Sequence, residues 1–168
     1  MTLRARTFES PVGTMLAVVD DGGALVELSF IDGPRLAARL AALERAGAEL
    51  DAPACEAVVL QLGEYFEGRR RTFDIPCDPP GSPFQRQVWG ALRAVPYGET
   101  VSYGQLAHRV GQPDTDRAVG RANATNPVAI VIPCHRAIGA DGSLTGYAGG
   151  LAIKQRLLEL EAGTLSLL

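Results

Sequence analysis

A cluster of prolines at the centre of this sequence constrains its fold more than any other feature. Residues 77–83, Cys-Asp-Pro-Pro-Gly-Ser-Pro, hold three prolines and a glycine. A helix or a central strand does not run through such a segment, because proline has no backbone donor and a fixed φ. A chain of 168 residues suits one ordinary domain or two small ones. We therefore predict two domains, 1–80 and 81–168.

The two predicted domains differ in charge. Residues 1–80 carry eight arginines against thirteen Asp and Glu, a net charge of −5. Residues 81–168 carry seven arginines and one lysine against six acidic residues, a net charge of +2. This split suggests that only the second domain meets a polyanion, although ordinary sampling of charges would also produce it. A hydrophobic fraction of 46% excludes a disordered chain.

The first half has the pattern of a small α+β unit without recognisable site chemistry. Val26, Leu28 and Phe30 alternate with polar residues, as in a half-buried strand. Leucines at helical spacing between Pro34 and Gly47 predict a helix. In full, the predicted elements are strands at 3–9, 14–20 and 24–30, helices at 34–47 and 53–67, and a short strand at 72–75.

The second half begins with a predicted helix-turn-helix. Ser82 and Ser102 are expected N-caps of helices that run to about residue 94 and over 103–110. After a turn at 111–114, with Asp114 as the next cap, a further helix is predicted over 115–124. Two helices separated by about four residues have helix-turn-helix spacing, although most such pairs simply pack together.

The helix at 115–124 combines small residues with two arginines. Arg117 and Arg121 are four residues apart and project from one side. A helix of this kind suits a nucleic-acid groove, although a tightly packed internal helix is the alternative and Asp116 opposes simple phosphate binding. The small residues are Ala118, Gly120, Ala122 and Ala124.

A reactive motif follows an apolar run. Residues 128–132 are predicted to form a buried strand that leads into Pro133-Cys134-His135-Arg136. Basic and cationic neighbours lower the pKa of a thiol, and the thiolate is the nucleophile. The motif therefore indicates a candidate catalytic cysteine, although Cys-His neighbours are mostly incidental.

A hairpin turn at 139–143, a Gly-rich segment at 146–150 and a helix at 151–161 complete the chain. A helix pair followed by a hairpin is similar to a winged helix-turn-helix.

The remaining composition limits cofactors and compartment. The three cysteines, Cys55, Cys77 and Cys134, cannot form a disulfide framework, and two histidines offer no zinc-type cluster. Cys55 and Cys77 are expected to be buried core residues. No apolar run reaches the length of a membrane span, and the N-terminus has no signal-type apolar region. We expect a cytoplasmic protein without metal, cofactor or membrane contact.

These motifs resemble the O6-alkylguanine-DNA alkyltransferases. The resemblance covers residues 83–162 densely, and residues 1–80 match in layout the family's variable ribonuclease-like domain. It implies an α+β protein with an N-terminal ribonuclease H-like α/β domain and a C-terminal winged helix-turn-helix alkyltransferase domain. The matching segments are 96–99 (PYGE), 102–107 (SYGQLA), 117–120 (RAVG), 126–128 (NPV), 133–136 (PCHR) and 144–150 (LTGYAGG).

The resemblance implies direct reversal of DNA alkylation. Cys134 would take the alkyl group of a flipped O6-alkylguanine and keep it, so each molecule acts once. His135 would be a general base acting through water, oriented by Glu161. Asn126 resembles the family's hinge residue, and Tyr103 the tyrosine that donates to the departing guanine.

The resemblance also assigns DNA and pocket residues. Arg117 would enter the duplex in place of the flipped base. The further DNA-contacting residues would be Tyr103, Ala118, Gly120, Arg121, Ala122, Asn123 and Arg136, and the pocket would be lined by Val128, Ala137, Tyr147, Ala148 and Lys154. Ala137 replaces a bulkier Val that is common in the family. The expected partner is duplex DNA with O6-alkylguanine or O4-alkylthymine, bound by a monomer that clusters on DNA.

Three other functions fit parts of the pattern. An alkyltransferase-like lesion sensor lacks the acceptor thiol, so the presence of Cys134 argues against it. A winged-helix regulator needs side chains for base readout, and the Ala/Gly-rich helix offers few. A papain-like hydrolase needs an oxyanion hole, which no segment indicates.

Overall fold

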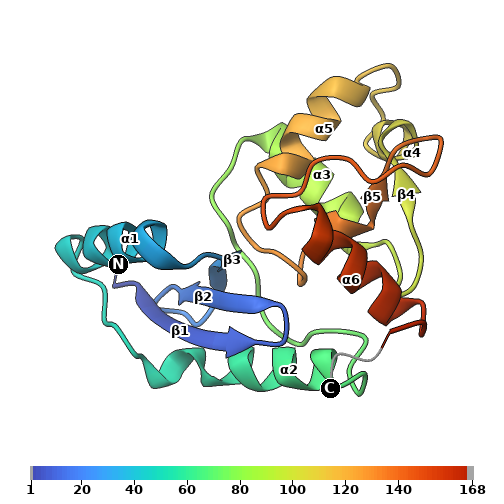
Figure 1. Cartoon of the computed structure of the whole chain (residues 1–168). Helices are drawn as coiled ribbons and strands as arrows, with labels where there is room; N and C mark the ends of the chain where they lie inside the picture. The colour runs from blue at the N-terminus through green and yellow to red at the C-terminus, as the bar shows by residue number, and fades with distance from the viewer. Residues whose placement is uncertain (1, 166–168) are drawn as a thin grey trace. The chain divides into compact units, whose positions relative to one another are not determined.

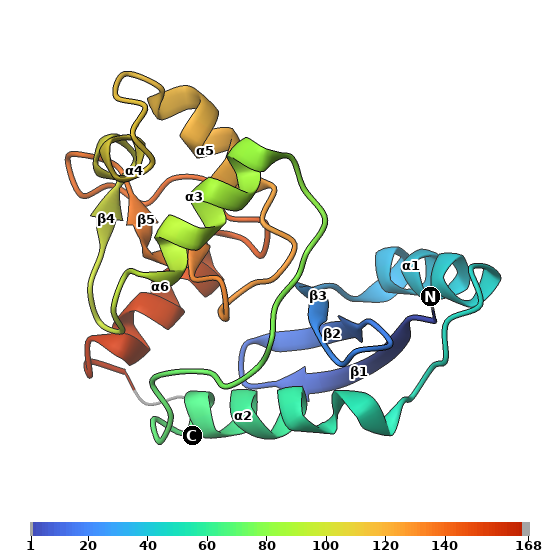
Figure 2. The ribbon, with the colours of Figure 1, turned by 180° about the vertical axis from the view of Figure 1, so that it is seen from behind.

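The computed structural model describes residues 2–165, and the chain divides into two compact units (Figures 1 and 2). The first unit ends at Pro79 and the second spans Pro80–Leu165. No helix within residues 2–165 is long and apolar enough to cross a membrane.

The first unit is built on a three-stranded antiparallel sheet, β1 (Arg4–Ser10), β2 (Gly13–Val19) and β3 (Leu25–Phe30), with β2 in the centre. Both faces of β2 are buried, since residues 15–19 are at most 1% exposed. Leu16 and Val18 pack with Leu43 of α1 (Gly33–Arg45). The short helix η1 (Pro53–Cys55) leads into α2 (Glu56–Phe66), which lies on the other side of the sheet from α1 (Figure 1).

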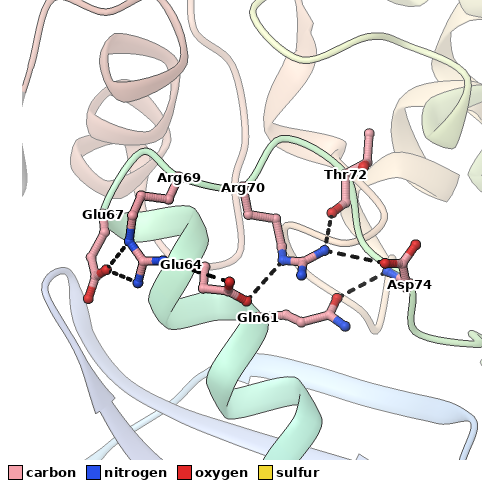
Figure 3. Close-up of polar contacts among 7 residues, drawn as sticks. All are labelled: Gln61, Glu64, Glu67, Arg69, Arg70, Thr72 and Asp74. Carbon is pink, nitrogen blue, oxygen red and sulfur yellow. Dashed lines mark hydrogen bonds and ion pairs between the residues drawn. The ribbon is translucent and has the colours of Figure 1, made fainter.

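The predicted strand at 72–75 is wrong. Side chains hold the segment instead (Figure 3). Gln61 Oε1, in the middle of α2, accepts from the Asp74 amide at 3.0 Å, and Arg70, beyond the end of α2, donates to the Thr72 carbonyl at 2.9 Å. Sheet pairing occurs only at Cys77, which forms an isolated bridge with Leu25. A longer ladder is blocked because proline donates no hydrogen bond and residues 76, 79 and 80 are prolines.

The second unit packs α3 (Pro83–Arg93) and α4 (Tyr103–Arg109) against α5 (Asp116–Ala124). Ser82 and Ser102 cap α3 and α4 as predicted, each in a capping box with the glutamine three residues later. Trp89 Nε1 donates to the Ala122 carbonyl at 2.9 Å and fixes α3 on α5. The last helix is α6 (Leu151–Glu161).

Two local predictions in the second unit are wrong. Asp114 does not cap α5: it has φ +69°, and Thr115 is in the cap position without a side-chain cap bond. Residues 128–132 are buried except for the partly exposed Ala129, but apart from a bridge at Val128 they form turns rather than a strand, with Ile130 at φ +67°. The apolar run therefore predicted correctly that this segment is buried, but it did not predict the backbone conformation of the segment.

The predicted hairpin is present only as a turn. The Gly139 amide donates to the Ser143 carbonyl at 2.9 Å and closes the turn. The preceding strand β5 (Ala137–Ile138) pairs in parallel with β4 (Val101–Ser102). This pairing joins the segment after the reactive motif to the start of α4.

Candidate active site

Cys134 begins a single 3-10 turn, η2 (Cys134–Arg136), in which three consecutive polar or reactive side chains are buried. A strand would send neighbouring side chains to opposite faces, whereas this turn brings all three into the interior. The Cys134 amide donates to the Ile132 carbonyl at 2.8 Å, which fixes the start of the turn.

Asn126 holds the segment that leads to the cysteine. Its Nδ2 donates to the carbonyls of Val128 at 3.1 Å and Ile132 at 2.8 Å. Its Oδ1 accepts from the Val128 amide at 3.0 Å. The side chain therefore replaces the ladder bonds that a strand would have supplied, and it also lowers the pKa of the Cys134 thiol.

The environment of Cys134 opposes and supports ionisation at once. Burial raises the pKa of the thiol, because the thiolate loses hydration, whereas the hydrogen bond from Asn126 and the charge of Lys154 lower it. Lys154 is fully buried and donates to the carbonyls of Ala137 at 2.6 Å and Thr145 at 2.8 Å. Burial also lowers the pKa of Lys154.

His135 and Glu161 form a buried pair. His135 Nε2 lies 2.7 Å from Glu161 Oε2, and the imidazole is fully buried. Within residues 2–165, His135 Nδ1 has no hydrogen-bond partner. Burial lowers the pKa of His135, and the bond to Glu161 offsets part of this effect. A neutral imidazole that donates from Nε2 to the carboxylate leaves Nδ1 as a free acceptor.

Arg136 faces the interior, so its predicted contact with DNA is wrong. Its Nε and terminal nitrogen donate to the two oxygens of Glu161 at 2.8 and 2.9 Å. Its other terminal nitrogen donates to the Val95 carbonyl at 2.8 Å, and its guanidinium lies 5.8 Å from the Tyr97 ring centre. The residue holds Glu161 in a bidentate ion pair.

Glu161 remains ionised despite its position. Burial opposes ionisation, but hydrogen bonds from His135 and Arg136 outweigh it and lower the pKa of Glu161 far below its ordinary value. The Gly98 amide adds a longer hydrogen bond at 3.3 Å.

Tyr103 and the segment around Tyr147 border the same region. The Tyr103 hydroxyl lies 2.9 Å from Thr145 Oγ1. Burial of its hydroxyl raises the pKa of Tyr147 well above the ordinary value, and the charge of Cys134 adds to this effect. Among the other predicted pocket residues, Val128 and Ala137 are fully buried and Ala148 is exposed.

The two faces of α5 differ. Arg117 and Arg121 are exposed, and Ala118 and Gly120 are partly exposed. A shallow hollow of about 210 Å³ runs beside them, lined by Phe84, Gln85, Ala118, Arg121, Ala122 and Thr125.

Asn123 packs inward with Val119 and Ala122, since these three residues recur at the helical period and are at most 3% exposed. The prediction that the Asn123 side chain contacts DNA is therefore wrong. Ala122 is also buried, but it forms part of the lining of the hollow.

Comparison with known proteins identifies the family. Residues 3–79 match the model of the 6-O-methylguanine DNA methyltransferase ribonuclease-like domain, and residues 83–163 match that of its DNA binding domain. This chain belongs to the 6-O-methylguanine DNA methyltransferase family.

Relatives in this family align over nearly the whole chain. A methylated-DNA–protein-cysteine methyltransferase of Mycolicibacterium paratuberculosis is 49% identical over 93% of this chain and 90% of its own length. One from Methanosarcina acetivorans is 46% identical over 92% and 95%. The crystal structure of Mycobacterium tuberculosis OGT in complex with DNA is 42% identical, with a TM-score of 0.84, over 96% of this chain and 94% of that one.

Within this methyltransferase, the structure brings most of the predicted catalytic residues together. Asn126 holds the segment that leads to Cys134, and His135 contacts Glu161, whereas Tyr103 is linked to this group through Thr145 and Lys154. Thr145 itself was assigned no role from the sequence, because a threonine in a loop motif gives no chemical signal. Its position in the matching segment at 144–150 was the one available sign.

Residues 2–165 hold no group of three or more His, Cys, Asp or Glu side chains arranged to bind a metal ion.

Proposed function

We propose that this chain repairs DNA by transferring the alkyl group of O6-alkylguanine to Cys134 in a single irreversible step. The observation that carries the proposal is a buried thiol at the start of η2, whose leading segment Asn126 holds in place and which is next in sequence to the His135–Glu161 pair. A thiol, a neutral imidazole with a free nitrogen and an orienting carboxylate are the parts of an activated cysteine nucleophile.

The transfer moves one proton and one alkyl group. The Cys134 proton passes through water to His135 Nδ1, and Glu161 stabilises the imidazolium that forms. The thiolate attacks the alkyl carbon, the S–C bond forms and the C–O6 bond breaks, leaving the electron pair on guanine. Guanine takes up one proton from Tyr103, which neutralises the developing charge. The proton held by His135 then replaces, through solvent, the one that Tyr103 gave up, so both side chains return to their neutral forms. The thioether is stable, so the thiol is not regenerated.

The exposed face of α5 supports DNA as the partner. Arg117 and Arg121 point outward beside small residues that allow close approach to a groove. Arg117 would fill the space left by the flipped base. Asp114 and Asp116 on the same segment are exposed and weaken the attraction to phosphate. We infer a cytoplasmic monomer that clusters on DNA and whose recognition depends more on groove insertion than on many phosphate contacts.

The test is intact-protein mass spectrometry after mixing with a duplex that contains one O6-methylguanine. One methyl group is expected per molecule, and peptide mapping should place it on Cys134. Cys55→Ser and Cys77→Ser should still react, whereas Cys134→Ala should not. Methylation of Cys55 or Cys77, or repeated turnover by one molecule, would contradict the proposal. Tight binding of the lesion without any transfer would indicate a lesion sensor instead.

A further inference from the structure

We infer that Thr145 is a positioning residue for the transfer: its hydroxyl orients the hydroxyl of Tyr103 toward the departing guanine. The inference rests on the proposed function and adds to it a residue that does not touch the reacting atoms. Tyr103 Oη and Thr145 Oγ1 lie 2.9 Å apart, although 42 residues separate them in sequence.

The backbone of Thr145 is anchored, so its side chain is a defined partner rather than a mobile one. Its carbonyl accepts a hydrogen bond of 2.8 Å from Lys154 Nζ, which is fully buried. The same ammonium donates at 2.6 Å to the carbonyl of Ala137, the residue that follows η2. Lys154 therefore holds both Thr145 and the residue that follows η2.

Tyr103 is anchored from its own side. It is the first residue of α4, and the capping box of Ser102 and Gln105 fixes where that helix begins. The phenol ring is then free to rotate only about its own side-chain bonds. The bond to Thr145 supplies the restraint at the far end of the ring, where the hydroxyl proton is located.

The chemistry of the pair suits a proton donor. Either hydroxyl can donate to the other. When Thr145 donates to the Tyr103 oxygen, the phenolic proton is released to point at the substrate, and the donated bond polarises the phenol and strengthens it as a donor. The two hydroxyls lie toward the surface rather than in the core, so a base entering the site can reach them.

Two substitutions isolate this role. Thr145→Val keeps the shape and removes the hydroxyl, and Thr145→Ser restores it. The matched control is Thr14→Val in the first unit, which removes another exposed threonine hydroxyl bond, that of Thr14 Oγ1 to Glu9 at 2.7 Å. Each variant is measured as the full chain in single-turnover reactions, which separate affinity for the lesion duplex from the transfer rate at saturation.

The decisive comparison uses two alkyl donors. Transfer from O6-methylguanine in DNA needs a donor at the leaving guanine, whereas alkylation of Cys134 by iodoacetamide releases iodide, which needs none. Thr145→Val should slow transfer at saturating DNA about fivefold, the effect of losing one neutral hydrogen bond. It should leave DNA affinity and the iodoacetamide rate unchanged, and Thr145→Ser should recover most of the loss.

Three outcomes would overturn the inference. The first is a wild-type transfer rate in Thr145→Val, the second is equal slowing of the iodoacetamide reaction and of guanine transfer in that variant, and the third is failure of Thr145→Ser to recover activity. Failure of the proposed function itself is distinguishable, because the wild-type chain would then transfer nothing to Cys134.

Discussion

His135 Nε2 lies 2.7 Å from Glu161 Oε2, and both side chains are almost completely buried. The carboxylate can stay charged there because Arg136 neutralises it from the other side. His135 and Arg136, which are adjacent in η2, thus both bind the Glu161 carboxylate. This arrangement fixes the plane of the imidazole relative to the neighbouring Cys134 thiol.

Replacement of Glu161 by Gln should slow alkyl transfer by at least about tenfold, because the base loses the charge that stabilises its protonated form. Glu161 raises the pKa of His135 against the effect of burial. The acid limb of the pH–rate profile should therefore move to lower pH in Glu161→Gln. The profile is measured in single-turnover reactions, with Glu159→Gln, an exposed-side residue of the same helix that bonds Gln155, as the control. An unchanged profile would show that Glu161 does not act through His135.

Arg136→Ala should destabilise the second unit by about 3–5 kcal/mol, because it leaves a buried carboxylate without its cation. Arg93→Ala, at an exposed position, should change stability little. Urea unfolding followed by the fluorescence of Trp89, the only tryptophan, reports on this unit alone. If Arg136→Ala were as stable as the wild type but bound DNA less tightly, a surface role for Arg136 would be restored.

The second unit should lose stability as the pH falls. The pKa of His135 is lowered in the folded state, so the unfolded chain takes up its proton first and stability declines below about pH 6.5. The pKa of Glu161 is also lowered, so its contribution is complete above about pH 4.3 and is lost as the pH falls further. The same urea unfolding, repeated across this range, checks both.

His135→Asn should remove the decline between about pH 6.5 and pH 5, whereas the exposed His108→Asn should keep it. If the stability of His135→Asn still declined over this pH range, the decline would belong to the titration of another group.

Lys154→Met should slow alkylation of Cys134 by iodoacetamide at neutral pH about tenfold, because Lys154 lowers the pKa of the thiol. The rate should recover at higher pH, where the thiol ionises without help. Arg156→Met, an exposed cation on the same helix, is the control. Equal slowing at every pH would indicate structural damage instead of lost charge.

Arg117→Ala should weaken binding to the lesion duplex on the order of tenfold, because Arg117 lies on the exposed face of α5. Its reaction with free O6-benzylguanine should match that of the wild type, since no base has to be flipped. Fluorescence anisotropy gives the affinity, and Arg109→Ala on α4 serves as the control. An equal loss with the free base would place Arg117 in the chemistry rather than in DNA binding.

Some of these features follow directly from local sequence. Ser82 and Ser102 predicted two helix starts correctly, because capping depends on neighbouring residues alone; the structure adds a capping box with the Gln three residues after each serine. The resemblance to the family likewise predicted the pairing of His135 with Glu161. By contrast, the strand expected at 72–75 failed because Gln61 of α2 binds the Asp74 amide and Arg70, just after α2, binds the Thr72 carbonyl.

The sequence alone determined the helices, the buried character of residues 128–132 and the chemical types gathered around Cys134. The direction of each side chain was decided only in the tertiary structure. Arg136 turns inward because Glu161, 25 residues away, offers it a buried carboxylate, and Asn123 turns inward because α3 and α4 cover that face of α5. An irregular turn such as η2 has no period from which a facing side can be read, so distant partners set its orientation.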